Sequence, residues 1–161
     1  MTLFEPVLAA LDAANVRFVV VGGVAVVLHG HPRMTADLDL VVDLAAESAG
    51  RAISALVTLG MEPRLPVDPQ AFADPEVRRG WIVQRSLTVF TMLDPNEPLL
   101  EVDLFAEPPL PFEELWGQAT IVQLGGQAVR IASIDHLITM KQAAGRPQDL
   151  ADVAALEALR G

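Results

Sequence analysis

Residues 17–42 read RFVVVGGVAVVLHGHPRMTADLDLVV, and this stretch decides the expected fold. It opens with the β-branched apolar run Arg17–Val21, which is typical of a buried strand. The pair Gly22–Gly23 interrupts the run, and the apolar segment Val24–Leu28 predicts a short helix. The alternating start of Asp37–Val42 predicts a second strand. A strand, a glycine turn, a short helix and another strand are therefore expected in direct succession.

The rest of the chain alternates between helical and extended patterns. Further helices are expected at residues 2–14, 44–59, 111–118, 134–144 and from 147 onward, and further strands at 81–93, 99–105, 119–124 and 128–131. Residues 63–80, rich in Pro, Asp and Arg, are expected to form a loop or short irregular structure. The sum is an α/β (α+β) fold with a mixed β-sheet flanked by helices and with helices at its C-terminal end. The length of 161 residues and the hydrophobic content of 52% suit a single domain over residues 1–161.

The composition excludes several classes of protein. Without cysteine, the chain has no disulfide, thiol nucleophile or zinc–thiolate site. A net charge of −10 argues against a general nucleic-acid binder, so an RNA contact needs a local patch, for which Arg64, Arg78, Arg79 and Arg85 stand in one stretch. The longest apolar run, Phe18–Leu28, is shorter than the roughly 20 residues of a membrane-spanning helix. No secretory signal is visible, so we expect a cytoplasmic protein without a membrane partner.

Asp37 and Asp39 are the first candidate site residues. Because side chains two residues apart in a strand share a face, the two carboxylates project together, while Leu38 and Leu40 point into apolar packing. Adjacent carboxylates repel unless a positive charge lies between them. Oxygen ligands favour Mg²⁺ or Mn²⁺, and two such ions can activate an attacking hydroxyl and stabilise a leaving oxygen. A solvated strand edge is the alternative for such a pair.

Gly22 and Gly23 are the second candidate. Glycine lets the backbone approach a ligand closely, and the free N–H groups at the start of the following helix attract anions such as phosphate. A tight turn that requires a positive φ is the alternative explanation. The stretch is not a dinucleotide-binding fingerprint, because the third glycine and the acidic residue that closes a βαβ unit are missing.

Residues 22–39 combine these features in a more specific pattern. They read G-G-x-A-x-x-x-H-G-x-x-R-x-T-x-D-x-D, which resembles the signature of the nucleotidyltransferase superfamily with its polymerase-β-like fold. Within that superfamily, the chain is most similar to small proteins of the AbiEii toxin type and to related uncharacterised bacterial nucleotidyltransferases. The resemblance extends to MKQAAGRPQDLADV, where Lys141, Arg146, Asp149 and Asp152 look like that group's closing pattern.

The resemblance implies a catalytic site with three acids. Asp103, in the apolar segment LLEVDLFAE, is the third carboxylate beside Asp37 and Asp39. In the family mechanism the three acids are metal ligands, and Asp103 also acts as general base for the acceptor hydroxyl. Glu101 shares a strand face with Asp103 and is its rival for this role.

The resemblance also implies a set of residues that bind the phosphates of the nucleotide. Two Mg²⁺ or Mn²⁺ ions offset part of the charge of a nucleoside triphosphate, and cationic side chains must offset more. The set consists of Gly22, Gly23, Arg33, Thr35 and Lys141. Lys141 is the only lysine in the chain, and an ion pair with an acid of the last helix, Asp149 or Asp152, is an equal alternative for it.

The expected activity is metal-dependent transfer of a nucleoside monophosphate from an NTP to a hydroxyl. By resemblance to the AbiEii group, the acceptor is a tRNA or a protein, in a toxin–antitoxin setting with an antitoxin partner. One alternative is a small-molecule enzyme similar to the aminoglycoside and lincosamide nucleotidyltransferases, because an acidic protein suits a cationic aminoglycoside. Another is a non-catalytic nucleotide-binding module, because Val24 stands where many members carry a hydroxyl residue.

Overall fold

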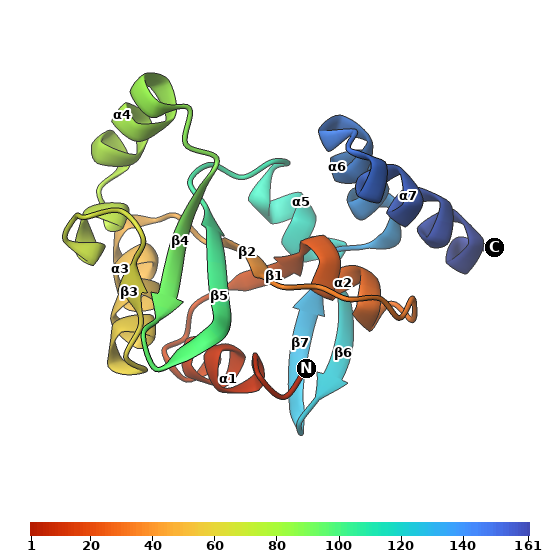
Figure 1. Ribbon diagram of the computed structural model, residues 1–161, viewed down its shortest axis with the longest axis horizontal. Helices are drawn as coiled ribbons and strands as arrows, with labels where there is room; N and C mark the ends of the chain where they lie inside the picture. The colour runs from red at the N-terminus through yellow and green to blue at the C-terminus, as the bar shows by residue number, and fades with distance from the viewer.

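The computed structural model describes residues 1–161, and a seven-stranded mixed sheet forms its centre (Figure 1). The strands are β1 (Phe18–Val21), β2 (Leu38–Val42), β3 (Glu62–Pro63), β4 (Val89–Asp94), β5 (Glu97–Phe105), β6 (Thr120–Leu124) and β7 (Gln127–Ile131). They lie in the order β3-β4-β5-β2-β1-β7-β6. β2 pairs with β5, and β1 with β7, in parallel, whereas all other neighbours are antiparallel.

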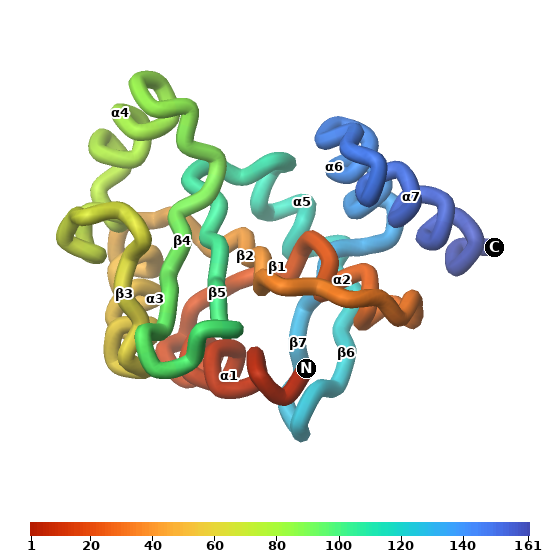
Figure 2. The backbone as a smooth tube through the Cα atoms, viewed as in Figure 1, coloured from red at the N-terminus to blue at the C-terminus, as the bar shows by residue number.

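Helices surround this sheet. They are α1 (Glu5–Ala13), α2 (Gly22–Leu28), α3 (Ala46–Thr58), the 3₁₀ helix η1 (Pro69–Ala73), α4 (Pro75–Arg85), α5 (Phe112–Gly117), α6 (Ile134–Ala144) and α7 (Pro147–Arg160). α1 and α3 contact each other, and α3 lies behind β3 and β4 in the view of Figure 1. α6 and α7 pack against each other beside α2, on the right of the tube in Figure 2.

The β1–α2–β2 unit is the part of the fold that positions the site. α2 starts at Gly22, whose φ of +67° ends β1 and turns the chain into the helix. The chain returns through a loop and enters β2 antiparallel to β1, with Val21 opposite Asp39. Leu38 and Leu40 are fully buried. Their alternation with Asp39 holds this acid on the other face of the sheet.

A continuous hydrophobic core joins α1 and α3 to the sheet. Leu8 of α1 and Ile53 of α3 are fully buried together with Leu40 of β2 and Leu104 of β5. Full burial of such a side chain contributes about 1.5–3 kcal/mol. The core is therefore a rigid base from which β2 and β5 present their polar side chains on the opposite face.

The predicted strand over residues 81–93 is wrong in its first part. α4 continues to Arg85, and β4 begins only at Val89. Trp81 is buried and stacks on Phe90, with ring centroids 5.3 Å apart. Trp81 is therefore buried by its contact with β4, although the backbone of this segment is helical.

The predicted loop or short irregular structure over residues 63–80 is wrong in its last part, because α4 begins at Pro75; the short 3₁₀ helix η1 precedes it. The carboxylate of Asp74 accepts a hydrogen bond from Glu76 N, and Pro75 occupies the first turn of α4. An aspartate followed by proline is a helix-start signal. The sequence contains this signal, but the Pro, Asp and Arg residues around it are equally typical of loops.

The fold class is confirmed: the protein is a mixed α/β structure with helices flanking the sheet and two helices at the C-terminal end. The predicted hairpin near residues 119–131 forms as β6 and β7. Ser133 caps α6 by accepting a hydrogen bond from His136 N, and Gly145 ends that helix with a φ of +66°. No helix of the protein combines the length and the apolar character that crossing a bilayer requires.

Candidate active site

Four acidic side chains gather where β2 and β5 run side by side. The parallel register places Asp39 of β2 opposite Asp103 of β5. Asp37 immediately precedes β2, and Glu101 lies two residues before Asp103 on the same face of β5. Carboxylate oxygens of Asp37, Glu101 and Asp103 lie within 4.8 Å of one another. The structure thus brings together the three predicted acids and their predicted rival, Glu101.

Asp39 packs against the glycine turn. A Cβ atom on Gly22 would overlap with Asp39 Oδ2, so only glycine leaves room for this carboxylate. Burial, followed by the charges of Asp103 and Asp37, raises the pKa of Asp39 from 3.8 to about 7, while the ammonium of Lys141 acts in the opposite direction. A carboxylate in this environment needs a further cation to stay ionised at neutral pH.

Asp103 has a fixed hydrogen-bond partner on β4. Thr91 Oγ1 donates to Asp103 Oδ1 at 2.6 Å, and both residues are buried. Burial raises the pKa of Asp103, the hydrogen bond from Thr91 opposes this increase, and the charge of Asp37 adds to it. One oxygen of Asp103 is therefore held by the threonine hydroxyl, which leaves its second oxygen for other partners.

A cleft of about 560 Å³ opens at these acids. Its polar lining includes Gly22, Asp37, Asp39 and Asp103, together with Lys141 and Arg146. Its apolar lining comes largely from the end of β5, the β5–α5 segment and α6, for example Phe105, Leu110 and Met140. A mostly apolar cleft with a few convergent charged groups is the usual form of a small-ligand site.

Two cations of the predicted phosphate-binding set are held by acids of α7. Arg33 Nε and Nη2 lie 2.9 and 3.0 Å from the two oxygens of Asp152, but only the Nη2 contact has hydrogen-bond geometry. Lys141 Nζ lies 3.0 Å from Asp152 Oδ2 and 3.4 Å from Asp149 Oδ1. Arg146 Nε donates to Asp149 at 2.6 Å. The ion pairs that were the alternative role for Lys141 thus form, and Lys141 also lines the cleft.

The five predicted phosphate-binding residues fall into two groups. Gly22 and Lys141 line the cleft, whereas Gly23, Arg33 and Thr35 do not. The latter three meet at the turn instead. A Cβ atom on Gly23 would lie 2.6 Å from Thr35 Oγ1 and 2.7 Å from Arg33 Nη2, so the absence of a side chain at this position lets both groups approach.

The four arginines expected to form a local patch do not share one surface. Arg78 is buried and donates hydrogen bonds to backbone carbonyls of residues 72 and 44. Arg64 forms an ion pair with Glu101. Arg79 and Arg85 are exposed on α4. The chain therefore has no continuous basic patch in this segment.

Sequence reasoning did not assign two residues to the acidic cluster, Thr91 and Arg64, the latter of which was expected in a basic patch. Thr91 holds Asp103 from β4. Arg64 reaches Glu101 from the segment after β3, where its N–H donates to Thr91 O at 2.9 Å. Both contacts depend on pairing between strands that are distant in sequence, and no local motif marks either residue.

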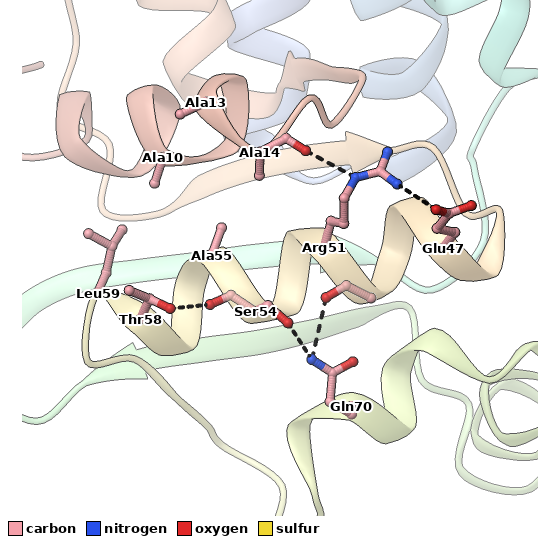
Figure 3. A pocket seen from close by; sticks show the side chains of 11 residues that line it. Ala10, Ala13, Ala14, Glu47, Arg51, Ser54, Ala55, Thr58, Leu59 and Gln70 are labelled. Carbon is pink, nitrogen blue, oxygen red and sulfur yellow. Dashed lines mark hydrogen bonds and ion pairs between the residues drawn. The ribbon is translucent and has the colours of Figure 1, made fainter.

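A second hollow of about 650 Å³ lies between α1 and α3 (Figure 3). Its polar groups are already paired with one another: Arg51 Nε donates to Ala14 O at 3.0 Å, Arg51 pairs with Glu47, and Gln70 Nε2 donates to Ser54 Oγ at 2.9 Å. It holds no convergent acids and no buried unpaired charge. The convergent acidic side chains of the molecule therefore lie in the smaller cleft at the sheet, not in this hollow.

The acidic cluster suits a hard divalent cation. Its donors are carboxylate oxygens only, which Mg²⁺ and Mn²⁺ prefer. Mutual repulsion among Asp37, Asp39 and Asp103 is a physical reason for a cation to bind, because a positive charge lowers the raised pKa values. The residues present therefore fit the metal requirement expected from the resemblance.

Known structures share this architecture over almost the whole chain. The solution structure of the antibiotic-resistance factor ANT(2'')-Ia is 18% identical, with 99% of this chain and 83% of that chain covered and a TM-score of 0.61. The lincosamide adenylyltransferase LnuA, bound to lincomycin, is 15% identical, with 98% and 96% covered and a TM-score of 0.67. A nucleotidyltransferase-like protein from Paracoccidioides brasiliensis is 19% identical, with 98% and 75% covered and a TM-score of 0.55.

The sheet and its flanking helices define the fold as that of a nucleotidyltransferase, because solved nucleotidyltransferases share it over almost the whole chain. The family model described as "Nucleotidyl transferase AbiEii toxin, Type IV TA system" matches residues 7–160. The chain therefore belongs to the AbiEii nucleotidyltransferase family. No curated protein matches the chain.

Proposed function

We propose that residues 1–161 act as one catalytic domain that moves a nucleoside monophosphate from an NTP to a hydroxyl of a tRNA or a protein. We further propose that the protein depends on divalent cations and is a toxin with an antitoxin partner. The observation that carries the chemistry is the placement of Asp39 beside Asp103 on parallel strands, with Asp37 at the entrance of β2. The family match supports the toxin–antitoxin setting.

The three aspartates share one role in this proposal, and Asp103 has a second. Asp37, Asp39 and Asp103 would hold two Mg²⁺ ions, which would supply positive charge that neutralises the phosphates and lowers the pKa of the acceptor hydroxyl. Asp103 also accepts the proton of the attacking hydroxyl. The hydroxyl oxygen then bonds to the α-phosphorus, and pyrophosphate leaves.

The glycine turn and Lys141 bind the phosphates. Gly22 lines the cleft beside Asp39, and glycine allows the backbone N–H groups at the start of α2 to approach an anion. Gly23 permits Arg33 and Thr35 to approach the same turn, so these two residues support its shape and its positive character. Lys141 adds a cation from α6.

Val24 does not favour the non-catalytic alternative. Its side chain is fully buried, so a hydroxyl at this position would point into the core. Thr35 Oγ1 already lies next to the glycine turn and offers a hydroxyl there. The departure from the family pattern is thus compatible with an active enzyme.

The direct test incubates the purified protein with each α-labelled NTP and with tRNA or protein acceptors, in Mg²⁺ and in EDTA. We expect label transfer in Mg²⁺ only, and its loss in Asp37→Ala, Asp39→Ala and Asp103→Ala. Asp135→Asn, at an exposed ion pair in the first turn of α6, is the matched control and keeps activity. Absence of transfer to every acceptor with all four NTPs contradicts the proposal.

A small-molecule acceptor is the second candidate. The apolar part of the cleft, including Phe105, Pro109, Leu110 and Met140, offers a surface for an organic acceptor. Structurally similar proteins were solved with lincomycin and with adenylyl-2"-tobramycin. The same assay with aminoglycosides and lincosamides, and the phenotype on expression, separate the candidates: antibiotic resistance selects the small molecule, and growth arrest selects the toxin.

A further inference from the structure

Arg64 places a positive charge on the outer side of the acidic cluster. The backbone N–H of Arg64 donates to Thr91 O, so Arg64 lies next to Thr91 on β4. Thr91 in turn lies opposite Asp103 on β5. The guanidinium of Arg64 crosses β4 and forms an ion pair with Glu101. The Arg64 side chain is 58% exposed, whereas that of Glu101 is 22% exposed. A solvent-accessible arginine thus neutralises a largely covered acid.

Glu101 is also within reach of the site that holds the other acids. One oxygen each from Glu101, Asp37 and Asp103 lies within 4.8 Å of the other two. Oxygens that bind one Mg²⁺ or Mn²⁺ ion, each at about 2.0–2.2 Å, lie about 3–4 Å apart, so a small movement of these side chains suffices. Glu101 therefore has two competing partners, the guanidinium of Arg64 and a divalent cation.

We propose that Glu101 is an additional ligand of a divalent cation at the acidic cluster, and that Arg64 is an internal competitor which the cation displaces. This inference rests on the proposed metal-dependent function. When the cation binds, the Arg64–Glu101 ion pair breaks, a cation–Glu101 contact forms, and the guanidinium turns into solvent. No covalent bond changes. Exposed ion pairs are weak, so a divalent cation with three carboxylate ligands replaces this one readily.

Two physical consequences follow for metal binding. Removal of the Glu101 charge takes away one ligand and weakens affinity for the cation. Removal of the Arg64 charge frees Glu101 and strengthens affinity, provided that Glu101 is present. If Arg64 competes directly, the effect of removing its charge depends on the presence of Glu101. A general change in electrostatic potential has no such dependence.

The experiment titrates the nucleotide-free protein with Mn²⁺ and measures free Mn²⁺ by electron paramagnetic resonance. We expect Glu101→Gln to weaken affinity about tenfold and Arg64→Gln to strengthen it. In the double variant, Arg64→Gln has no further effect. Arg64→Lys keeps the competing charge and shows an intermediate affinity. Glu97→Gln on β5 and Arg85→Gln on α4, both exposed, are matched controls and bind as the wild type does.

The outcomes separate this inference from the proposed function. If Asp103→Asn loses Mn²⁺ binding and Glu101→Gln keeps it, the proposed metal site stands and the role of Glu101 is wrong. If Arg64→Gln strengthens binding equally with and without Glu101, competition is wrong and Arg64 acts through its charge alone. If the wild type binds no Mn²⁺, both proposals fail. Thermal melting in EDTA verifies that each variant is folded.

Discussion

Two groups of charged residues lie partly buried in the protein, the acids at the sheet centre and a charge network around α7. The network consists of Arg33, Lys141, Arg146, Asp149 and Asp152. In the network, burial alone would raise the pKa of Asp152, yet hydrogen bonds from Lys141 and Arg33 outweigh it and lower the pKa. At the sheet centre, burial and neighbouring acids raise the pKa values of Asp39 and Asp103. Both acids of the network have cationic partners, whereas Asp37, Asp39 and Asp103 form no ion pair.

This difference separates charges that hold the fold from charges that await a ligand. Asp152 joins three parts of the chain, because Arg33 comes from the α2–β2 loop and Lys141 from α6. The acids on β2 and β5 repel one another and destabilise the fold when no cation is bound. Perturbed carboxylates in a cleft indicate a functional site rather than a structural one.

The largest expected effect comes from breaking the network. Asp152→Asn leaves Arg33 and Lys141 without their shared negative charge, and both side chains are less than one-fifth exposed. We expect the free energy of unfolding to fall by about 3–5 kcal/mol, as measured by urea denaturation at neutral pH. The matched control is Asp135→Asn, which breaks the exposed pair with Arg160 and changes stability by at most about 1 kcal/mol. Equal losses of stability in Asp152→Asn and Asp135→Asn would contradict the expectation that the buried ion pairs contribute more than the exposed one.

The acidic cluster is expected to respond in the opposite direction. Asp39→Asn should stabilise the metal-free protein, because ionisation of Asp39 is unfavourable in the folded state. The folded-state pKa of about 7 lies above the ordinary 3.8, so wild-type stability falls as the pH rises through this window. The advantage of the variant should therefore grow by on the order of 2 kcal/mol between about pH 5 and about pH 8. Urea denaturation in EDTA at both pH values measures it.

Added Mg²⁺ sharpens the same comparison. The cation stabilises the ionised acids of the wild type, so the advantage of Asp39→Asn should shrink at the higher pH. A stability difference that stays constant with pH, or that Mg²⁺ leaves unchanged, contradicts the assignment of Asp39 to a cation site. Label transfer by the variant should be lost under all conditions.

A third prediction concerns the contact between the glycine turn and the acidic cluster. Gly22→Ala introduces a Cβ atom that overlaps with Asp39 Oδ2 and also strains a backbone with a φ of +67°. Gly60→Ala strains a backbone with a φ of +94°, but its Cβ atom meets nothing within 4 Å. We expect Gly22→Ala to be less stable than Gly60→Ala by about 1–3 kcal/mol. Thermal melting measures stability, and equal losses would show that the carboxylate moves aside freely.

Local signals in the sequence were sufficient for the parts of the fold that flank the cleft. The glycine pair at Gly22, the serine cap at Ser133 and the stop at Gly145 each act on their own segment. Residues 81–85 were misassigned because their apolar run suits a strand or a helix equally. The choice depends on the helix start at Asp74 and on contacts with β4, which a short window of sequence does not contain.

The candidate site likewise has residues that the sequence predicted and contacts that only the fold reveals. Strand alternation and the family resemblance were sufficient to name Asp37, Asp39 and Asp103, but only the sheet order shows that β2 and β5 are neighbours. The partner of Arg33 lies on α7, more than a hundred residues away in the chain. Thr91 is likewise a site residue only because β4 pairs with β5. Contacts of this kind are set by tertiary packing and have no local pattern.

The smallest expected effect belongs to Lys141, which is part of both regions. Lys141→Met leaves Asp149 paired with Arg146, and Asp152 paired with Arg33. We therefore expect a loss of stability of about 1 kcal/mol, well below that of Asp152→Asn. Because Lys141 also lines the cleft, the KM for the NTP should rise more than kcat falls, and Lys141→Arg should restore part of the affinity. An unchanged KM together with reduced stability would assign Lys141 to the network alone. Phosphate binding in the cleft would then depend on the glycine turn and on the bound divalent cations.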